Sequence, residues 1–230
     1  MFARQLGIAA ASLALLGSGI VMGGQSASAA TCDGLSVPCA IGDTGPGGGI
    51  VFYDAGSRRT WGRYLEAAPL DWRKENFSLW CDRSQPGYAQ RLRTGLIIGT
   101  GAANTALIIK NCGKKSAAGA AAGYRGGGKS DWFLPSRAEL NQLFLQRAKV
   151  GDFEGEEMYW SSSQARQRTP VADLPSDKPT GRSLGRVPSQ QGTAKGLPVS
   201  AWAQDFMTGR AQPLWKWGAG LFPVLPVRAF

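Results

Sequence analysis

The stretch Gly123-Tyr-Arg-Gly-Gly-Gly-Lys-Ser-Asp-Trp-Phe-Leu-Pro-Ser-Arg-Ala-Glu-Leu-Asn-Gln-Leu-Phe144 carries two signals that compete for one region of the fold. Its first part, Gly123 to Ser130, matches the pattern G-x-x-x-x-G-K-[ST] of a phosphate-binding P-loop. That loop requires a buried strand before it and a helix that begins at its Lys-Ser pair. Residues 116–122 are instead small and rich in alanine, and 131–135 form an aromatic, strand-like run that ends in proline. We therefore predict a glycine loop that leads into a strand, and no nucleotide site.

The second part of the stretch predicts a helix that begins after Ser136. Ser136 and Glu139 have the spacing of a capping box, in which each residue satisfies a backbone N–H of the other. Gly151 is a stop signal for a helix that ends near Lys149. The helix has one apolar stripe at helical spacing, made of Leu140, Leu143 and Phe144.

The beginning of the chain predicts export. Arg4 precedes an apolar run from Leu6 to Met22, and the small residues Ala27-Ser-Ala29 follow. This order is typical of a secretory signal peptide, so we predict a signal peptide over residues 1–30 that is cleaved after Ala29 or Ala30. The mature protein is then secreted or held in the cell envelope, with no transmembrane segment after cleavage.

Composition limits the classes of function. The 230 residues include 26 Lys+Arg against 16 Asp+Glu, a formal net charge of +10, which favours polyanionic partners. There is no histidine, and this excludes Ser-His-Asp and Cys-His catalytic units and any His-ligated metal. Residues 31–230 suit one compact domain. The 32 Gly, 13 Pro and 8 Trp indicate many turns and aromatic packing instead of a helical bundle.

Four cysteines in an exported protein predict two disulfides. Three pairings are open, and we favour Cys32–Cys39 with Cys81–Cys112 because each joins neighbours along the chain. A zinc site is the alternative, but the CxxC spacing typical of such sites is missing.

Before the central stretch, two strands and a helix are expected. A glycine-rich turn leads into a strand from Ile50 to Tyr53, and Trp61 to Ala68 returns as a second strand, with Arg58-Arg59 in the turn between them. Asp71 to Arg93 is polar with scattered aromatic residues, and we predict a surface excursion held by Cys81. A helix is predicted from about Ala102 to Lys110, with three residues facing inward: Ala106, Leu107 and Ile109.

After the central stretch, Tyr159-Trp-Ser-Ser-Ser163 predicts a short strand that opens into a long loop from Gln164 to Gly196. Loops of this length are usually functional or disordered, and both alternatives stay open. A meander of strands follows, over 201–207, 211–217 and 221–230. Trp215 and Trp217 fall on one strand face, where core packing is the simpler interpretation and a sugar-binding platform the alternative. The basic side chains of the long loop are Arg166, Arg168, Lys178, Arg182, Arg186 and Lys195.

Five motifs in a fixed order carry a family resemblance. They are Ile41-Gly-Asp-Thr-Gly-Pro-Gly-Gly-Gly-Ile-Val-Phe-Tyr53, Gly99-Thr-Gly-Ala-Ala-Asn-Thr105, Ser130-Asp-Trp-Phe-Leu-Pro-Ser136 with Glu139-Leu140, Tyr159-Trp-Ser-Ser-Ser163 and Val227-Arg-Ala-Phe230. Together they resemble the Legionella collagen-like (Lcl) C-terminal domain family over nearly all of residues 31–230. The resemblance implies an α+β, C-type-lectin-like fold related to formylglycine-generating enzymes: an antiparallel sheet with two short helices and long irregular loops.

The resemblance also implies that the first and last strands pair, as Ile50–Tyr53 and Val224–Phe230 could, and that a long loop sits on the top face. It implies surface adhesion and, in the family's namesake, binding of sulfated polysaccharides. This chain lacks the collagen-like repeats that would trimerise the namesake. The family offers no agreed catalytic residues to transfer.

Three functions follow from these observations. The first is a non-enzymatic binding or adhesion module for acidic or sulfated glycans or other polyanions. It would use the loop cations together with Arg58, Arg59 and Trp160, because Arg and Lys bind anionic groups by charge-assisted hydrogen bonds and an indole can stack on a sugar. The second is a structural or partner-binding envelope protein. The third, an enzyme of the formylglycine-generating type, would need a reactive cysteine pair. No cofactor is expected, and calcium stays open because some lectin-like domains bind it.

Overall fold

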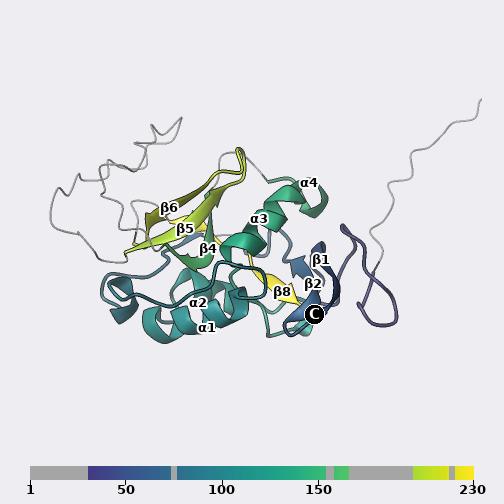
Figure 1. Ribbon diagram of the computed structural model, residues 1–230, viewed down its shortest axis with the longest axis horizontal. Coiled ribbons are helices and arrows are strands. Elements are labelled where there is room, and N and C mark those ends of the chain that lie inside the picture. The colour runs from purple at the N-terminus through teal and green to yellow at the C-terminus, as the bar shows by residue number, and fades with distance from the viewer. Residues whose placement is uncertain (1–30, 74–76, 154–157, 166–198, 218–220) are drawn as a thin grey trace, which may run out of the picture.

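The computed structural model describes residues 31–73, 77–153, 158–165, 199–217 and 221–230, and it confirms the predicted α+β class. The predicted signal peptide and most of the predicted long loop lie outside these residues. Two three-stranded sheets stand apart in Figure 1, with helices below one and above the other. Every pairing between the named strands is antiparallel.

The first sheet has the strand order β1-β2-β8. β1 (Ile50–Arg59) and β2 (Gly62–Ala67) form a twisted hairpin, and β8 (Val227–Ala229) joins the far edge of β2. The prediction that the first and last strands pair directly is therefore wrong, because β2 lies between them. The outer edge of β1 is already occupied: Val51 N–H donates to Asp43 O over 2.8 Å, and Gly42 N–H donates to Val51 O over 2.8 Å.

The second sheet has the order β4-β5-β6 and contains the predicted meander. Its strands are β4 (Met158–Gln164), β5 (Ser200–Asp205) and β6 (Ala211–Trp215), and β5 and β6 meet at the predicted turn around Gly209. The chain then leaves this sheet. β7 (Phe222–Pro223) pairs with β3 (Phe77–Ser78), and β8 crosses to the first sheet, so the last meander strand is not formed as predicted.

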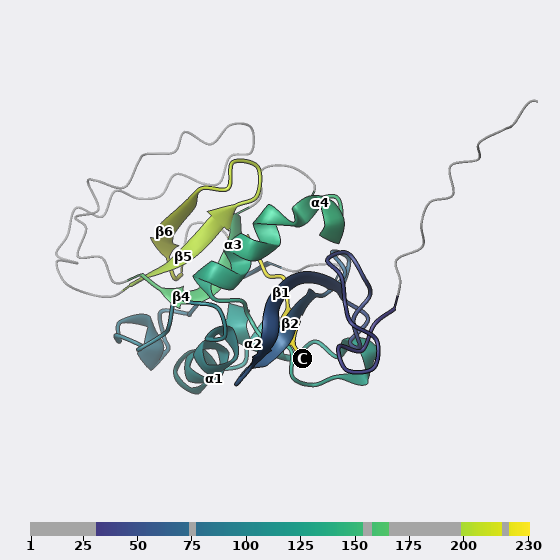
Figure 2. The ribbon, with the colours of Figure 1, turned by 45° about the vertical axis from the view of Figure 1, so that its right-hand side comes forward.

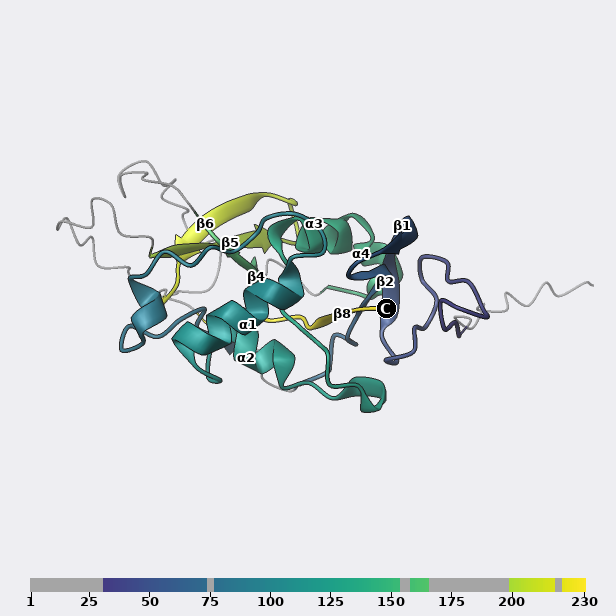
Figure 3. The ribbon, with the colours of Figure 1, turned by 60° about the horizontal axis from the view of Figure 1, so that its bottom comes forward.

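Four α-helices lie in the described residues, where two were predicted. α1 (Gly101–Cys112) and α2 (Ala117–Ala122) run side by side beneath the second sheet, as Figure 3 shows from below. α3 (Arg137–Leu145) and α4 (Arg147–Val150) lie above the β1–β2 hairpin in Figure 2. The predicted single helix to Lys149 is broken at Gln146, whose φ of −104° and ψ of 12° depart from helical values.

The central stretch folds as the capping interpretation predicts. The Ser136 side chain accepts from Glu139 N–H, and a Glu139 carboxylate oxygen accepts from Ser136 N–H over 2.6 Å. The P-loop context is absent, because helix α2 directly precedes Gly123 and Gly126–Gly128 form one turn of 3₁₀-helix. The strand predicted over 131–135 is reduced to one β-bridge, between Phe133 and Val227.

Two apolar clusters form the core. One lies between the first sheet and α3 and includes Phe52, Leu65 and Leu140. The other lies between the second sheet, α1 and α2, and includes Trp80 and Trp160. Asp71–Arg93 is therefore more than a surface excursion, because Trp80 within it is fully buried.

Both predicted disulfides are confirmed. Cys32–Cys39 closes the N-terminal loop, and Cys81–Cys112 ties the segment after β3 to the end of α1. These bonds use all four cysteines of the chain. The second disulfide also helps to set the inward face of α1, which was predicted in part: Leu107 and Ile109 pack against the second core cluster, whereas Ala106 is exposed. The buried residues of α1 are Gly101, Asn104, Thr105, Ile108 and Cys112.

A buried ion pair holds the glycine-rich turn that precedes β1. The fully buried Glu66 carboxylate accepts from Arg228 Nη1 over 2.8 Å, and from the Gly47 and Gly49 N–H groups over 3.0 and 3.1 Å. A Cβ at Gly47 would lie 2.6 Å from the Glu66 Oε1 atom, so the glycine is needed for this approach. The repeated glycines therefore wrap an internal carboxylate, as part of the predicted turn.

Candidate functional site

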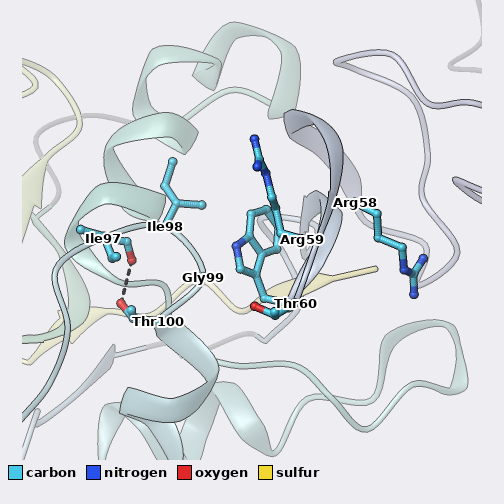
Figure 4. Close-up of a pocket in the computed structure, with 8 residues that line it drawn as sticks. Arg58, Arg59, Thr60, Ile97, Ile98, Gly99 and Thr100 are labelled. Carbon is cyan, nitrogen blue, oxygen red and sulfur yellow. Dashed lines mark hydrogen bonds between the residues drawn. The ribbon is translucent and has the colours of Figure 1, made fainter.

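A surface hollow lies between the tip of the β1–β2 hairpin and the segment that leads into α1 (Figure 4). Its volume is about 780 Å³, and it is open to solvent. Two short segments line it, residues 58–61 from the hairpin and residues 97–100 before the helix. We call it the hairpin hollow.

Two arginines form the basic side of the hairpin hollow. Arg58 and Arg59 are exposed at the end of β1, and within the described residues neither forms an ion pair. Arg59 Nη2 donates a long hydrogen bond, 3.5 Å, to Ala55 O. The register pairs Arg59 with Gly62, so the turn is Thr60-Trp61 and not Arg58-Arg59 as predicted. The side chains of Arg58 and Arg59 diverge in Figure 4, with Arg59 toward the hollow.

The apolar side of the hollow contains Trp61, Ile97 and Ile98. Ile97 is 69 % exposed. Trp61 is partly buried and lies against the Gly99 backbone, because a Cβ at Gly99 would fall 2.1 Å from the Trp61 Cδ1 atom. Gly99 also has a φ of +89°, a conformation that favours glycine. An indole, apolar side chains and the Arg59 guanidinium thus meet at one surface.

The wall formed by residues 97–100 is held from below by Glu139. The Glu139 Oε1 atom accepts from Gly99 N–H over 2.7 Å and from Gly101 N–H over 3.3 Å, at the start of α1. Burial raises the pKa of this carboxyl, and the hydrogen bonds from Ser136, Gly99 and Gly101 act in the opposite direction. Because Glu139 is fully buried and its oxygens are occupied, it fixes the wall and offers no acceptor to a ligand.

Two further interactions hold the two strands of the β1–β2 hairpin in place. Arg63 and Asp54 form a two-pronged ion pair, with Nε–Oδ1 and Nη2–Oδ2 distances of 2.7 and 2.9 Å, and the Arg63 hydrogen bond lowers the pKa of the Asp54 carboxyl. Phe230 O accepts from Arg63 N–H over 2.7 Å, so the C-terminal residue braces the hairpin. The hairpin is therefore braced as far as Asp54 and Arg63, and Arg58 and Arg59 lie beyond this pair, where the register of β1 is irregular.

Neither a protein-family model nor a curated protein matches this sequence. The resemblance to the Lcl C-terminal domain family therefore stays a prediction that rests on its motifs.

The remaining predicted ligand residues have different outcomes. Trp160 is fully buried, donates from Nε1 to Ser78 O over 2.9 Å and packs edge-on against Phe222, so the prediction that it stacks on a sugar is wrong. Its strand position places it opposite Ala203, on the sheet face that covers α1 and α2. The loop cations lie outside the described residues, namely Arg166, Arg168, Lys178, Arg182, Arg186 and Lys195.

The hollow brings Arg58 and Arg59 together with residues that sequence reasoning missed: Trp61, Ile97, Ile98 and Thr100. The sequence offers one signal for the second segment, the consecutive isoleucines Ile97 and Ile98, of which Ile98 packs against the first core cluster and Ile97 is exposed. Within the ranges that the structure covers, no group of three acidic or cysteine side chains could hold a metal ion. No helix there is both long and apolar enough to cross a membrane.

Proposed function

We propose that this chain is an exported, non-enzymatic binding module for acidic or sulfated glycans and other polyanions. The observation that supports it best is the pair of exposed arginines, Arg58 and Arg59, beside an indole and without carboxylate partners in the described structure. Guanidinium groups donate two parallel hydrogen bonds to sulfate, carboxylate or phosphate groups. Apolar sugar faces would lie against Trp61 and Ile97.

Charge and fold support the same proposal. A formal net charge of +10 attracts polyanions over the whole surface and raises their association rate. The α+β class with antiparallel sheets agrees with the C-type-lectin-like fold that the family resemblance implies, and we propose that fold for this chain. The loop cations between Gln164 and Gly196 would add charge to the same ligand.

The proposal is tested by heparin binding across a salt series. We compare the wild type with Arg58→Ser/Arg59→Ser and with a matched control, Lys114→Ser/Lys115→Ser, which removes two adjacent exposed cations from the turn after α1. We expect the arginine variant to lose about tenfold or more in affinity at low salt, with a shallower salt dependence. The lysine control should change much less.

One further variant and one chemical assay separate the alternatives. Arg58→Lys/Arg59→Lys keeps the charge, so an intermediate affinity would show that the guanidinium geometry contributes. If Arg58→Ser/Arg59→Ser and the Lys114→Ser/Lys115→Ser control lose the same affinity for heparin, only net charge matters. The structural envelope role would then be favoured. The enzyme alternative is tested by thiol titration of the folded protein, in which two or more free thiols would revive it.

A further inference from the structure

Two tryptophans lie on one face of the β5–β6 pair, and a third follows in the turn after β6. The register places Trp202 opposite Pro213 and Ser200 opposite Trp215, and residues directly opposite each other project to the same face. Trp217 follows two positions after Trp215, and their ring centroids are 6.5 Å apart. All three residues are partly exposed, and the Nε1 atom of Trp217 is buried. We call these residues the tryptophan strip.

An arginine is stacked at each end of the strip. The Arg137 Cζ atom lies 4.1 Å from the centroid of the Trp202 ring, and the Arg83 guanidinium lies over the Trp217 ring. Within the described residues, neither arginine forms an ion pair. A stacked guanidinium keeps its N–H donors in the plane of the group, directed away from the ring. The strip is therefore apolar along its length and cationic at both ends.

The ends of the strip are held by the protein interior. Arg137 N–H donates to Ser163 Oγ over 2.9 Å at the start of α3. At the other end, Cys81 N–H donates to Lys216 O over 3.0 Å, and the buried Lys216 ammonium donates to Gly87 O over 2.8 Å. The Cys81–Cys112 disulfide anchors the same segment. Arg83 and Trp217 are thus brought together before any ligand binds, which lowers the entropic cost of binding.

The rest of the protein covers only part of the sheet face that carries Trp202 and Trp215. α3 covers the end of β5 near Gln204, whose Nε2 donates to Asn141 Oδ1 over 3.0 Å. Trp202 lies against Arg137, the first residue of that helix, and Trp202, Pro213 and Trp215 stay partly exposed. The face that packs on the second core cluster is the opposite one, with Ala201, Ala203 and Leu214.

We propose that Trp202, Trp215 and Trp217, with Arg83 and Arg137 at the ends, form an elongated subsite for an acidic glycan chain. Pyranose faces would stack on Trp215 and on the indole faces that the arginines leave uncovered, and the arginines would bind carboxylate or sulfate groups. This inference takes only the class of its ligand, an acidic glycan, from the proposed function. The subsite itself lies on β5 and β6, on a different sheet from the hairpin hollow (Figures 1 and 2).

The test compares two polyanions on the full mature chain: a heparin oligosaccharide of defined length and inorganic polyphosphate, which has no sugar face. We expect Trp202→Ala/Trp215→Ala to weaken oligosaccharide binding about tenfold and to leave polyphosphate binding within about twofold. Arg83→Gln/Arg137→Gln should weaken binding of both about fivefold or more. Lys114→Gln/Lys115→Gln is the charge-matched control.

The outcomes separate this inference from the proposed function. If Arg58→Ser/Arg59→Ser weakens oligosaccharide binding and the strip variants do not, the strip is overturned and the hairpin hollow stands. If the wild type binds neither polyanion, both fail. If circular dichroism shows that the double tryptophan variant does not fold, Arg83→Gln/Arg137→Gln decides the question. A loss of affinity larger than that of Lys114→Gln/Lys115→Gln supports the strip, and no loss overturns it.

Discussion

Lys216 is a fully buried cation whose effect on stability can be measured directly. Its Nζ donates to the backbone carbonyls of Gly87 and Tyr88 over 2.8 and 3.0 Å and lies 5.0 Å from the centroid of the Trp80 ring. In the described structure no carboxylate forms an ion pair with it. Burial lowers the pKa of the Lys216 ammonium from 10.5 to about 7. The perturbation that we propose is Lys216→Met, which keeps most of the side-chain length and removes the charge.

The sign of the pH effect follows from proton binding. The unfolded lysine keeps its proton up to its ordinary pKa of 10.5, whereas the folded one loses it near 7. The unfolded state therefore binds more protons between these values, and the free energy of unfolding rises with pH in that window. Each pH unit contributes about 1.4 kcal/mol, so the rise from about pH 7 to about pH 9.5 is about 3 kcal/mol.

The assay is urea unfolding followed by tryptophan fluorescence at several pH values between about 6 and 9.5. Other groups titrate as well, so the informative quantity is the wild-type free energy of unfolding minus that of Lys216→Met. We expect this difference to rise by about 3 kcal/mol across the window. A difference that stays constant with pH would refute the reasoning, because the carbonyl hydrogen bonds would then have offset the cost of burying the charge.

Three further perturbations test the supports of the site. Glu139→Gln places an amide donor against backbone N–H groups, and we expect urea unfolding to show a loss of about 2–4 kcal/mol; an unchanged midpoint would contradict that role. Arg228→Met leaves the Glu66 carboxylate buried without its cation, at a cost of about 3–5 kcal/mol near pH 7. Since burial already raises the pKa of Glu66, protonation of its carboxyl near pH 5 should restore part of the lost stability. A loss of stability that does not depend on pH would contradict this explanation. Gly99→Ala should displace Trp61 and weaken heparin binding about threefold or more with the disulfides intact, and unchanged binding would mean that the indole takes no part.

Features that depend on neighbouring residues could be predicted from the sequence. The capping box of Ser136 and Glu139 uses residues three apart, and both disulfides follow from pairing cysteines in chain order. Most strands were found because their alternation or aromatic content is local. The evidence against a P-loop at Gly123 was also local, since the alanine-rich residues directly before it form a helix and not a strand.

Features that depend on distant contacts could not be predicted. The position of β8 is decided by the backbone of residues 42–44, which occupies the outer edge of β1. Trp160 was assigned to a ligand because an indole can stack on a sugar, but only the pairing with Ala203 shows that it faces the core. The hairpin hollow joins two segments that no sequence pattern connects, and Glu139, which holds one of them, belongs to a third.

The most direct test of polyanion binding at the hairpin hollow is a map of backbone amide chemical shifts during titration with a heparin oligosaccharide. Binding there predicts that the largest changes fall on residues 58–61 and 97–100 and on the Trp61 indole N–H, and that these changes are lost in Arg58→Ser/Arg59→Ser. If these amides keep their positions at oligosaccharide concentrations that saturate binding, the hollow is not the site.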